Sequence, residues 1–209
     1  IIYLTITDDL AGVVPQADGA ALSKPKAIAL LLENQDRAAK RIGVSKQIRL
    51  GFPDAGEYSY FKVREKIIQA IRQEKPDLIF TVDPWSPYEA HHDHVITGKA
   101  CAEAAILYTL PAIGEYHREE MKTFELMGVV FYNTAYPNLV FDITESIEAK
   151  QAALTAYTAQ FSEEELNHLV QQITFLARYV ARDEGFPYGE SLKILAPWML
   201  HGVPMAKAL

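Results

Sequence analysis

Short apolar runs alternate with amphipathic segments along the first half of the chain. The runs at residues 1–7, 47–50 and 78–82 are rich in β-branched and aliphatic side chains and are typical of buried strands. Between them, residues 25–42 and 58–74 carry apolar side chains at helical spacing. This alternation predicts an α/β fold with a mostly parallel sheet and helices on both of its faces.

The second half of the chain is interpreted as an elaboration of the same domain. It is expected to contain two strands, two helices and a short irregular segment, at residues 126–132, 139–143, 146–158, 163–182 and 191–196. Ser162 followed by Glu165 is the pattern of a capping box, which predicts that the last helix begins there. Residues 10–24 and 114–124 are interpreted as loops. No linker or internal repeat divides the 209 residues, so we interpret residues 1–209 as one domain.

The most distinctive stretch is residues 83–98, which follow one predicted strand and precede a helix expected at residues 94–107. In α/β proteins such a junction is where binding and catalytic groups usually lie. Three of the six histidines fall within four positions here, at His91, His92 and His94.

This stretch offers several kinds of chemistry. His94, in the first turn of the helix, is a candidate zinc ligand, and His91 is a candidate general acid or base. Asp93 could cap the helix, orient an imidazole, or do both. Trp85 and Tyr88 could stack on a sugar. An incidental surface cluster of histidines, and aromatics that belong to the core, remain the alternatives.

A complete hydrolytic zinc site needs three protein ligands, and the residues themselves do not supply all of them. Asp8 and Asp9 follow the first predicted strand, where they could face a site or simply form a turn. Cys101 is expected to be a small core residue rather than a nucleophile.

Composition excludes some partners. The net charge of −7 leaves no excess of lysine and arginine for nucleic acid, and no apolar run is long enough for a membrane span. One cysteine excludes an internal disulfide and is compatible with a cytoplasmic location. The expected partner is a small molecule, and self-association into a homo-oligomer stays an open option.

Residues 83–98 also carry a resemblance to a known family. The run Asp83-Pro84-Trp85 through Tyr88-Glu89-Ala90-His91-x-Asp93-His94 resembles the H-P-D-H signature of the LmbE-like, or PIG-L, zinc-dependent N-deacetylases. Other segments resemble the family in the same order, among them Ala38-Ala39, Leu50-Gly51-Phe52-Pro53-Asp54 and Lys75-Pro76-Asp77.

The resemblance implies a Rossmann-like deacetylase fold, a Zn2+ cofactor and an N-acetylglucosamine-type conjugate as substrate. It implies that His94 is a zinc ligand, that His91 stabilises the oxyanion or serves the leaving amine, and that Asp93 orients a histidine. Trp85 and Tyr88 are then expected to be substrate-binding residues.

Two departures from the family pattern matter. His92 stands where the family has proline, and the A-H-P-D-D motif, which supplies two zinc ligands and the general base, is absent. We therefore expect residues 1–7 to be the family's second strand, the first strand to be missing, and the chain as given to be inactive. The alternatives are an inactive family member that serves as a binding module, and a Rossmann-type nucleotide-binding enzyme. No G-x-G-x-x-G follows the first strand seen here, which counts against the latter.

Overall fold

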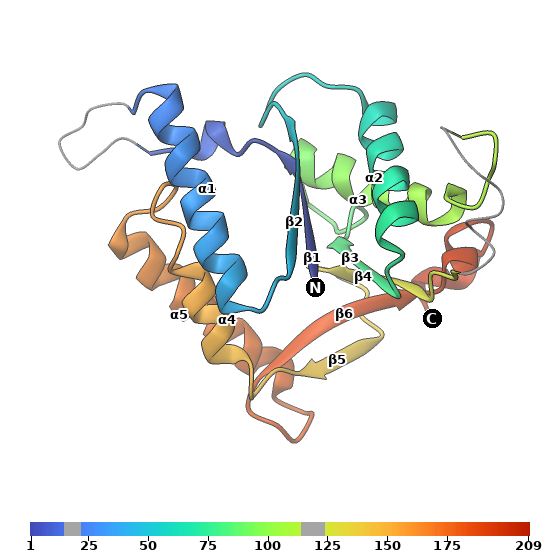
Figure 1. Ribbon diagram of the computed structural model, residues 1–209. Helices are drawn as coiled ribbons and strands as arrows, with labels where there is room; N and C mark the ends of the chain where they lie inside the picture. Colours follow the sequence, from blue (N-terminus) through green and yellow to red (C-terminus); the bar gives the residue numbers. More distant parts are fainter. Residues whose placement is uncertain (15–21, 114–123) are drawn as a thin grey trace. The chain divides into compact units, whose positions relative to one another are not determined.

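Two compact units make up the part of the chain that the computed structural model describes, which is residues 1–14, 22–113 and 124–209 (Figure 1). Unit 1 contains Ile1–Gly56 and Asp142–Glu190, and unit 2 contains Glu57–Phe141 and Ser191–Leu209. Residues 15–21 of the loop expected at residues 10–24, and residues 114–123 of the connection expected at residues 114–124, lie outside the described residues.

Unit 1 combines a pair of parallel strands with three helices. Its elements are β1 (Ile2–Thr7), a 3-10 helix (Leu10–Gly12), α1 (Lys24–Arg41), β2 (Lys46–Phe52), α4 (Ile147–Leu154) and α5 (Glu163–Ala181). The pairing of Ile2 with Lys46 sets the parallel register of β1 and β2. Helix α1 packs on α4 through small residues, since Ala38 and Ala153 share one core cluster.

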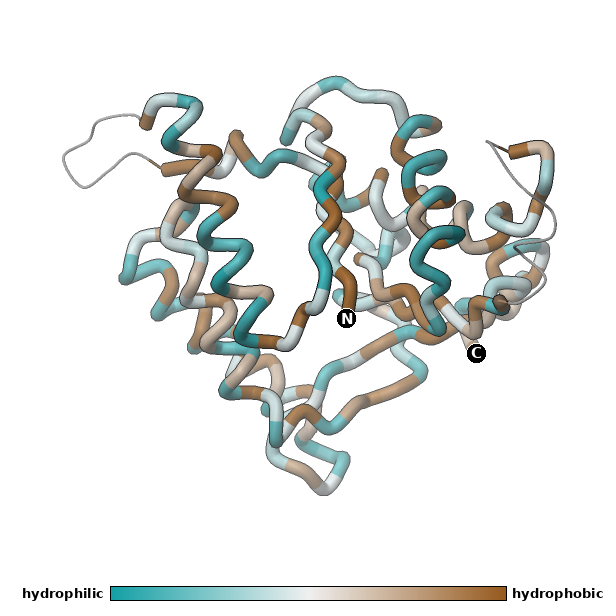
Figure 2. The backbone as a smooth tube through the Cα atoms, in the orientation of Figure 1, coloured by the Kyte–Doolittle hydropathy of each residue, from teal (hydrophilic) through white to brown (hydrophobic). Residues whose placement is uncertain are grey.

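A buried asparagine ties the two chain segments of unit 1 together. Asn34 of α1 is wholly buried, and its side-chain Oδ1 accepts a hydrogen bond of 2.7 Å from the backbone N–H of Ala159. Helix α5 begins at the capping box expected from the sequence: the backbone N–H groups of Glu165 and Ser162 each donate to the other residue's side chain. Figure 2 shows how polar and apolar residues alternate along α1, as its amphipathic sequence predicts.

Unit 2 contains a four-stranded sheet in the order β3-β4-β6-β5. Its elements are α2 (Tyr60–Glu74), β3 (Leu78–Val82), α3 (His92–Leu107), β4 (Gly128–Tyr132), β5 (Leu139–Asp142), β6 (Gly189–Leu195) and the 3-10 helices η3 (Pro197–Leu200) and η4 (Pro204–Lys207). Strand β3 is parallel to β4, and β6 is antiparallel to β4. Helices α2 and α3 pack on each other, and α3 also packs on β3. Residues Val129 to Phe131 of β4 are almost completely buried and belong to the core.

The α/β class predicted from the sequence is confirmed. Strand β1 pairs in parallel with β2, and β3 with β4, but these pairs belong to two different sheets. The expectation of an irregular segment at residues 191–196 was wrong, because residues 191–195 belong to β6. Lys193, in the middle of that strand, interrupts its apolar pattern, although the side chain is buried. Among the described residues, no helix is long and apolar enough to cross a membrane.

Gly98 allows α3 to approach the end of β3 closely. A Cβ atom at this position would lie 2.5 Å from the backbone oxygen of Val82 and 2.8 Å from Cδ of Pro84, closer than real Cβ contacts. We expect Gly98→Ala to lower the free energy of unfolding by about 1–3 kcal/mol, because α3 must move away from the strand. Chemical denaturation measures this change. Lys99→Ala, at the exposed next position, is the control and should stay within about 0.5 kcal/mol; an equally small effect of Gly98→Ala would contradict the close approach.

Candidate active site

The loop between β3 and α3 is built from turns that begin at Asp83. The backbone N–H of this buried residue donates to the oxygen of Tyr132, which extends the pairing of β3 and β4 by one residue. The side-chain Oδ1 of Asp83 accepts a hydrogen bond of 2.9 Å from the backbone N–H of Trp85. These bonds fix the direction in which the chain leaves the sheet, and so the place at which α3 begins.

Helix α3 begins at His92, with His91 as its N-cap residue. The expectation that Asp93 is the N-cap was therefore wrong. Asp93 lies in the first turn and is buried, and its Oδ1 accepts a hydrogen bond of 2.6 Å from the hydroxyl of Tyr58. Its negative charge still lies near the positive end of the helix dipole, where a carboxylate is stabilised.

The sequence-predicted residues His91 and His94 lie face to face. Their ring centroids are 4.4 Å apart, and the ring planes differ by 23°. A ring nitrogen of His91 and a carboxylate oxygen of Asp93 lie within 4.8 Å of each other. The spacing His91-x-Asp93-His94 thus brings three groups of metal-ligating or proton-transferring type to the start of one helix, while His92 is exposed.

Glu89 contacts both of these histidines. The sequence analysis did not predict a role for it. Its Oε1 accepts a hydrogen bond of 2.8 Å from the backbone N–H of His91, and its Oε2 lies 3.2 Å from Nδ1 of His94. The N–H of His91, and then the side chain of His94, lower the pKa of Glu89 below its ordinary value of 4.5. Because a carboxylate oxygen can only accept, the proton of a neutral His94 lies on Nδ1, and Nε2 keeps its lone pair.

The lowered pKa of Glu89 predicts a pH-dependent contribution to stability. A carboxyl group with a lowered folded-state pKa stabilises the folded protein above its unfolded-state value, and this contribution disappears as the pH falls through the folded-state value. We expect wild type to be more stable than Glu89→Gln above pH 4.5, and the difference to shrink below it. Unfolding of both proteins across this range measures the effect. Glu65→Gln, on the exposed face of α2, is the control. A stability difference that does not change with pH would contradict the contacts of Glu89.

The donor atoms at the start of α3 suit zinc. Imidazole nitrogen and carboxylate oxygen are common zinc ligands, and a histidine that binds zinc usually donates its other ring N–H to a carboxylate or carbonyl. His94 has this arrangement, because Glu89 takes its Nδ1 side and the side chain is 53% exposed. His91 and Asp93 offer a further nitrogen and oxygen near each other.

The two aromatic residues expected to bind substrate lie in different surroundings. The Trp85 side chain, 52% exposed, packs edge-on against Phe131 with ring centroids 5.6 Å apart. Tyr88 is fully exposed and has a positive φ of 69°. Their role in binding substrate stays a prediction. Cys101 is buried on α3, and burial raises the pKa of its thiol to about 11, which suits the core role expected for it.

In unit 1 the acidic residues after β1 form turns. The backbone N–H of Asp54 donates to Oδ1 of Asp8, and Oδ2 of Asp54 accepts from the N–H of Ala11. Asp9 accepts hydrogen bonds from Thr7 and Gln35, and burial is the largest cause of its raised pKa. Of the two interpretations of Asp8 and Asp9, these contacts support the turn.

Known proteins resemble this chain over its whole length. A family model described as PIG-L, GlcNAc-PI de-N-acetylase, matches residues 4–105. Diacetylchitobiose deacetylase of Thermococcus kodakarensis is 30% identical over 214 residues, which cover 100% of this chain and 77% of that protein. The structure of N,N′-diacetylchitobiose deacetylase from Pyrococcus horikoshii, in complex with an inhibitor, has a TM-score of 0.85 and 27% identity, with the same two coverages.

A structure with lower sequence identity shows that a shared fold does not identify the reaction. A 4-carboxy-2-hydroxymuconate hydratase from Pseudomonas putida has a TM-score of 0.69 over 93% of this chain and 95% of its own, but only 13% identity. It shares the fold, so the fold by itself does not define the reaction. The closer matches, together with the histidine-carboxylate cluster, define the class of this protein as N-deacetylase, an amide hydrolase. The chain belongs to the PIG-L, or LmbE-like, family.

Proposed function

We propose that this enzyme uses zinc to remove the N-acetyl group from an N-acetylglucosamine-type amino sugar conjugate. The observation that carries the proposal is the pairing of His94 with Glu89 beside His91 and Asp93, in a chain whose relatives are named diacetylchitobiose deacetylases. The products would be acetate and a free amine on the sugar.

Each residue of the cluster has a role in this proposal. His94 would hold the zinc through Nε2, while Glu89 keeps the ring in the correct tautomer. When bound, zinc polarises the amide carbonyl and lowers the pKa of water. His91, next to the carboxylate of Asp93, would donate a hydrogen bond to the oxyanion or a proton to the departing amine. Asp93, fixed by the hydroxyl of Tyr58, would hold the His91 ring in place.

The proposed substrate is a small molecule with both apolar faces and hydroxyl groups. The exposed rings of Trp85 and Tyr88 support this choice, because amphipathic aromatics can cover the apolar face of a sugar ring. We also propose a cytoplasmic location. The buried thiol of Cys101 is compatible with reducing surroundings, and cell fractionation would test this point.

Acetate release from a panel of amides tests the proposed activity. We expect the zinc-loaded protein, in its form that contains the A-H-P-D-D motif, to hydrolyse N,N′-diacetylchitobiose or N-acetylglucosamine at least about tenfold faster than Nα-acetyl-lysine, since the sugars fit an aromatic stacking site. Equal rates on all three would refute the substrate class. No acetate from any of them, with sugar binding retained, would instead support the inactive binding module.

A further inference from the structure

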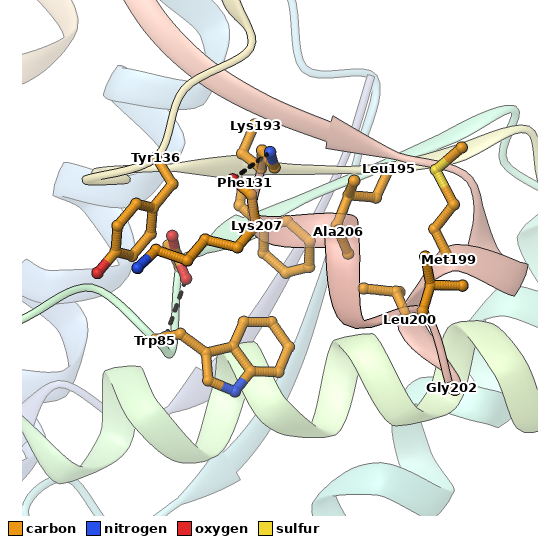
Figure 3. Close-up of a pocket in the computed structure, with 12 residues that line it drawn as sticks. Trp85, Phe131, Tyr136, Lys193, Leu195, Met199, Leu200, Gly202, Ala206 and Lys207 are labelled. Atoms are coloured by element: carbon orange, nitrogen blue, oxygen red, sulfur yellow. Dashed lines mark hydrogen bonds between the residues drawn. The ribbon is translucent and has the colours of Figure 1, made fainter. Parts of the chain in front are cut away.

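Unit 2 contains a pocket of about 360 Å³ that shares Trp85 with the residues proposed to bind the sugar but has its own charged and apolar wall. It lies beside β4 and β6 and is lined in part by residues of the two 3-10 helices η3 and η4 (Figure 3). This volume is in the range of small-ligand sites. None of the residues His91, Asp93 and His94 lines it, so the pocket is separate from the histidine cluster.

Lys193 is a buried cation at the wall of this pocket. Its residue is only 5% exposed, and Nζ donates a hydrogen bond of 3.2 Å to the backbone oxygen of Lys207. An ammonium group has three N–H donors, and this contact uses one of them. Among the residues that the structure describes, no carboxylate forms an ion pair with Nζ of Lys193.

The formal charges around the pocket do not cancel. Lys193 and Lys207 contribute two positive charges, and Asp83 contributes one negative charge, which leaves one positive charge in excess. Nζ of Lys207 lies 4.5 Å from the ring centroid of Tyr136, and Asp83 accepts the backbone N–H of Trp85. Because burying a charge without a partner is costly, a monoanion that reaches Lys193 would be favoured here.

The rest of the wall is apolar. Figure 3 shows the rings of Trp85 and Phe131 near each other, with Leu195, Met199 and Leu200 to their right. Trp85 is about half exposed, so part of its indole remains available to a ligand. A ligand body that fills this space must itself be apolar.

We propose that this pocket binds a small organic monocarboxylate with an apolar body, with the carboxylate on Nζ of Lys193 and the body against Trp85 and Leu200. This site is distinct from the cluster of His91, Asp93 and His94, although it shares Trp85 with the residues proposed to bind the sugar. The ligand's carboxylate would fix its orientation in the pocket, and burial of its apolar body would supply most of the affinity. A ligand therefore needs both a carboxylate and an apolar body.

Fluorescence of Trp85 tests the proposal directly. Trp198→Phe removes the second of the two tryptophans, is exposed and does not line the pocket, and leaves Trp85 as the reporter. Titration with octanoate should change this fluorescence saturably. Octanol has the body without the charge, and acetate has the charge with almost no body. Each should bind at least about tenfold more weakly than octanoate, since a hydrogen bond to a charged group and the burial of a hydrocarbon chain each contribute this much or more.

Two variants test whether Lys193 is the residue that binds the carboxylate. In the same background, Lys193→Met should remove the preference for octanoate over octanol but keep octanol binding, and Lys62→Met, on the exposed face of α2, should change neither. If Lys193→Met fails to fold, the comparison of octanoate, octanol and acetate in the Trp198→Phe protein decides between the outcomes. Equal binding of octanoate and octanol, or no saturable change with octanoate, would overturn the proposal.

Discussion

Replacement of His94 by alanine is expected to remove bound zinc and to lower the rate of acetate release at least about 100-fold. Loss of an outer partner of a metal ligand typically costs 10–100-fold in metal affinity or activity, so loss of a ligand itself should cost more. His94 is singled out because its Nδ1 faces Glu89, which leaves Nε2 for the metal. Zinc content of the purified variant and steady-state acetate release measure the two effects.

His92 provides the matched control for this experiment. It is a histidine of the same helix turn, and among the described residues its side chain forms no hydrogen bond or ion pair. His92→Ala should keep its zinc and stay within about twofold of wild-type activity, as expected for a surface substitution away from a site. Unchanged zinc in His94→Ala would show that His94 is not a ligand, and a loss of zinc in both variants would mean that the helix start itself had been disturbed.

Replacement of Asp93 by asparagine is expected to lower kcat by about 10–100-fold and to leave KM for the sugar nearly unchanged. The substitution keeps the shape of the side chain and removes the charge that lies near His91. Because Asp93 orients an imidazole in this account and touches no part of the sugar, the chemical step should lose more than binding. Kinetics on N,N′-diacetylchitobiose separate kcat from KM.

Tyr58→Phe is the companion variant, because it removes the 2.6 Å hydrogen bond to Asp93 but leaves the charge. Its effect on kcat should have the same direction and be smaller than that of Asp93→Asn. Thermal unfolding of both variants separates a positioning effect from a loss of folded protein. A normal kcat in folded Asp93→Asn would contradict the role of Asp93.

Much of the fold could be predicted because local patterns decide it. The predicted strand at residues 78–82 matches β3 residue for residue, since an uninterrupted apolar run bounded by polar residues has few other interpretations. Strand β6 was missed because Lys193 lies in its centre. Nζ of this lysine donates a hydrogen bond to the backbone oxygen of Lys207, which lies 14 positions further along the chain. The local sequence pattern does not indicate this hydrogen bond.

The candidate site was predictable where its parts are close in sequence. The spacing of His91, Asp93 and His94 within one helix start places them together, as expected. Tyr58 could not be found in this way, because it lies 35 positions before Asp93 and contacts it only through tertiary packing. The same contact explains the error about the helix start: the buried Asp93 carboxylate bonds to Tyr58.

Glu89 is an intermediate case. It belongs to the stretch that the sequence marked as important, but a lone glutamate near prolines is usually exposed and without a specific role. Its two contacts, to the backbone of His91 and to Nδ1 of His94, become visible only when the loop has its folded course. The signal that could have found it is the short distance in sequence between this carboxylate and two histidines.

Product analysis tests the proposal that the protein is a zinc-dependent N-deacetylase of amino sugars. The measurement is the amount of acetate and of free sugar amine formed from N,N′-diacetylchitobiose by the purified protein in its form that contains the A-H-P-D-D motif, before chelation, after chelation and again after zinc is restored. We expect equal amounts of the two products before chelation, none after chelation, and recovery with zinc. Equal product formation by the chelated and the zinc-restored protein, or no product in either, would contradict the proposal.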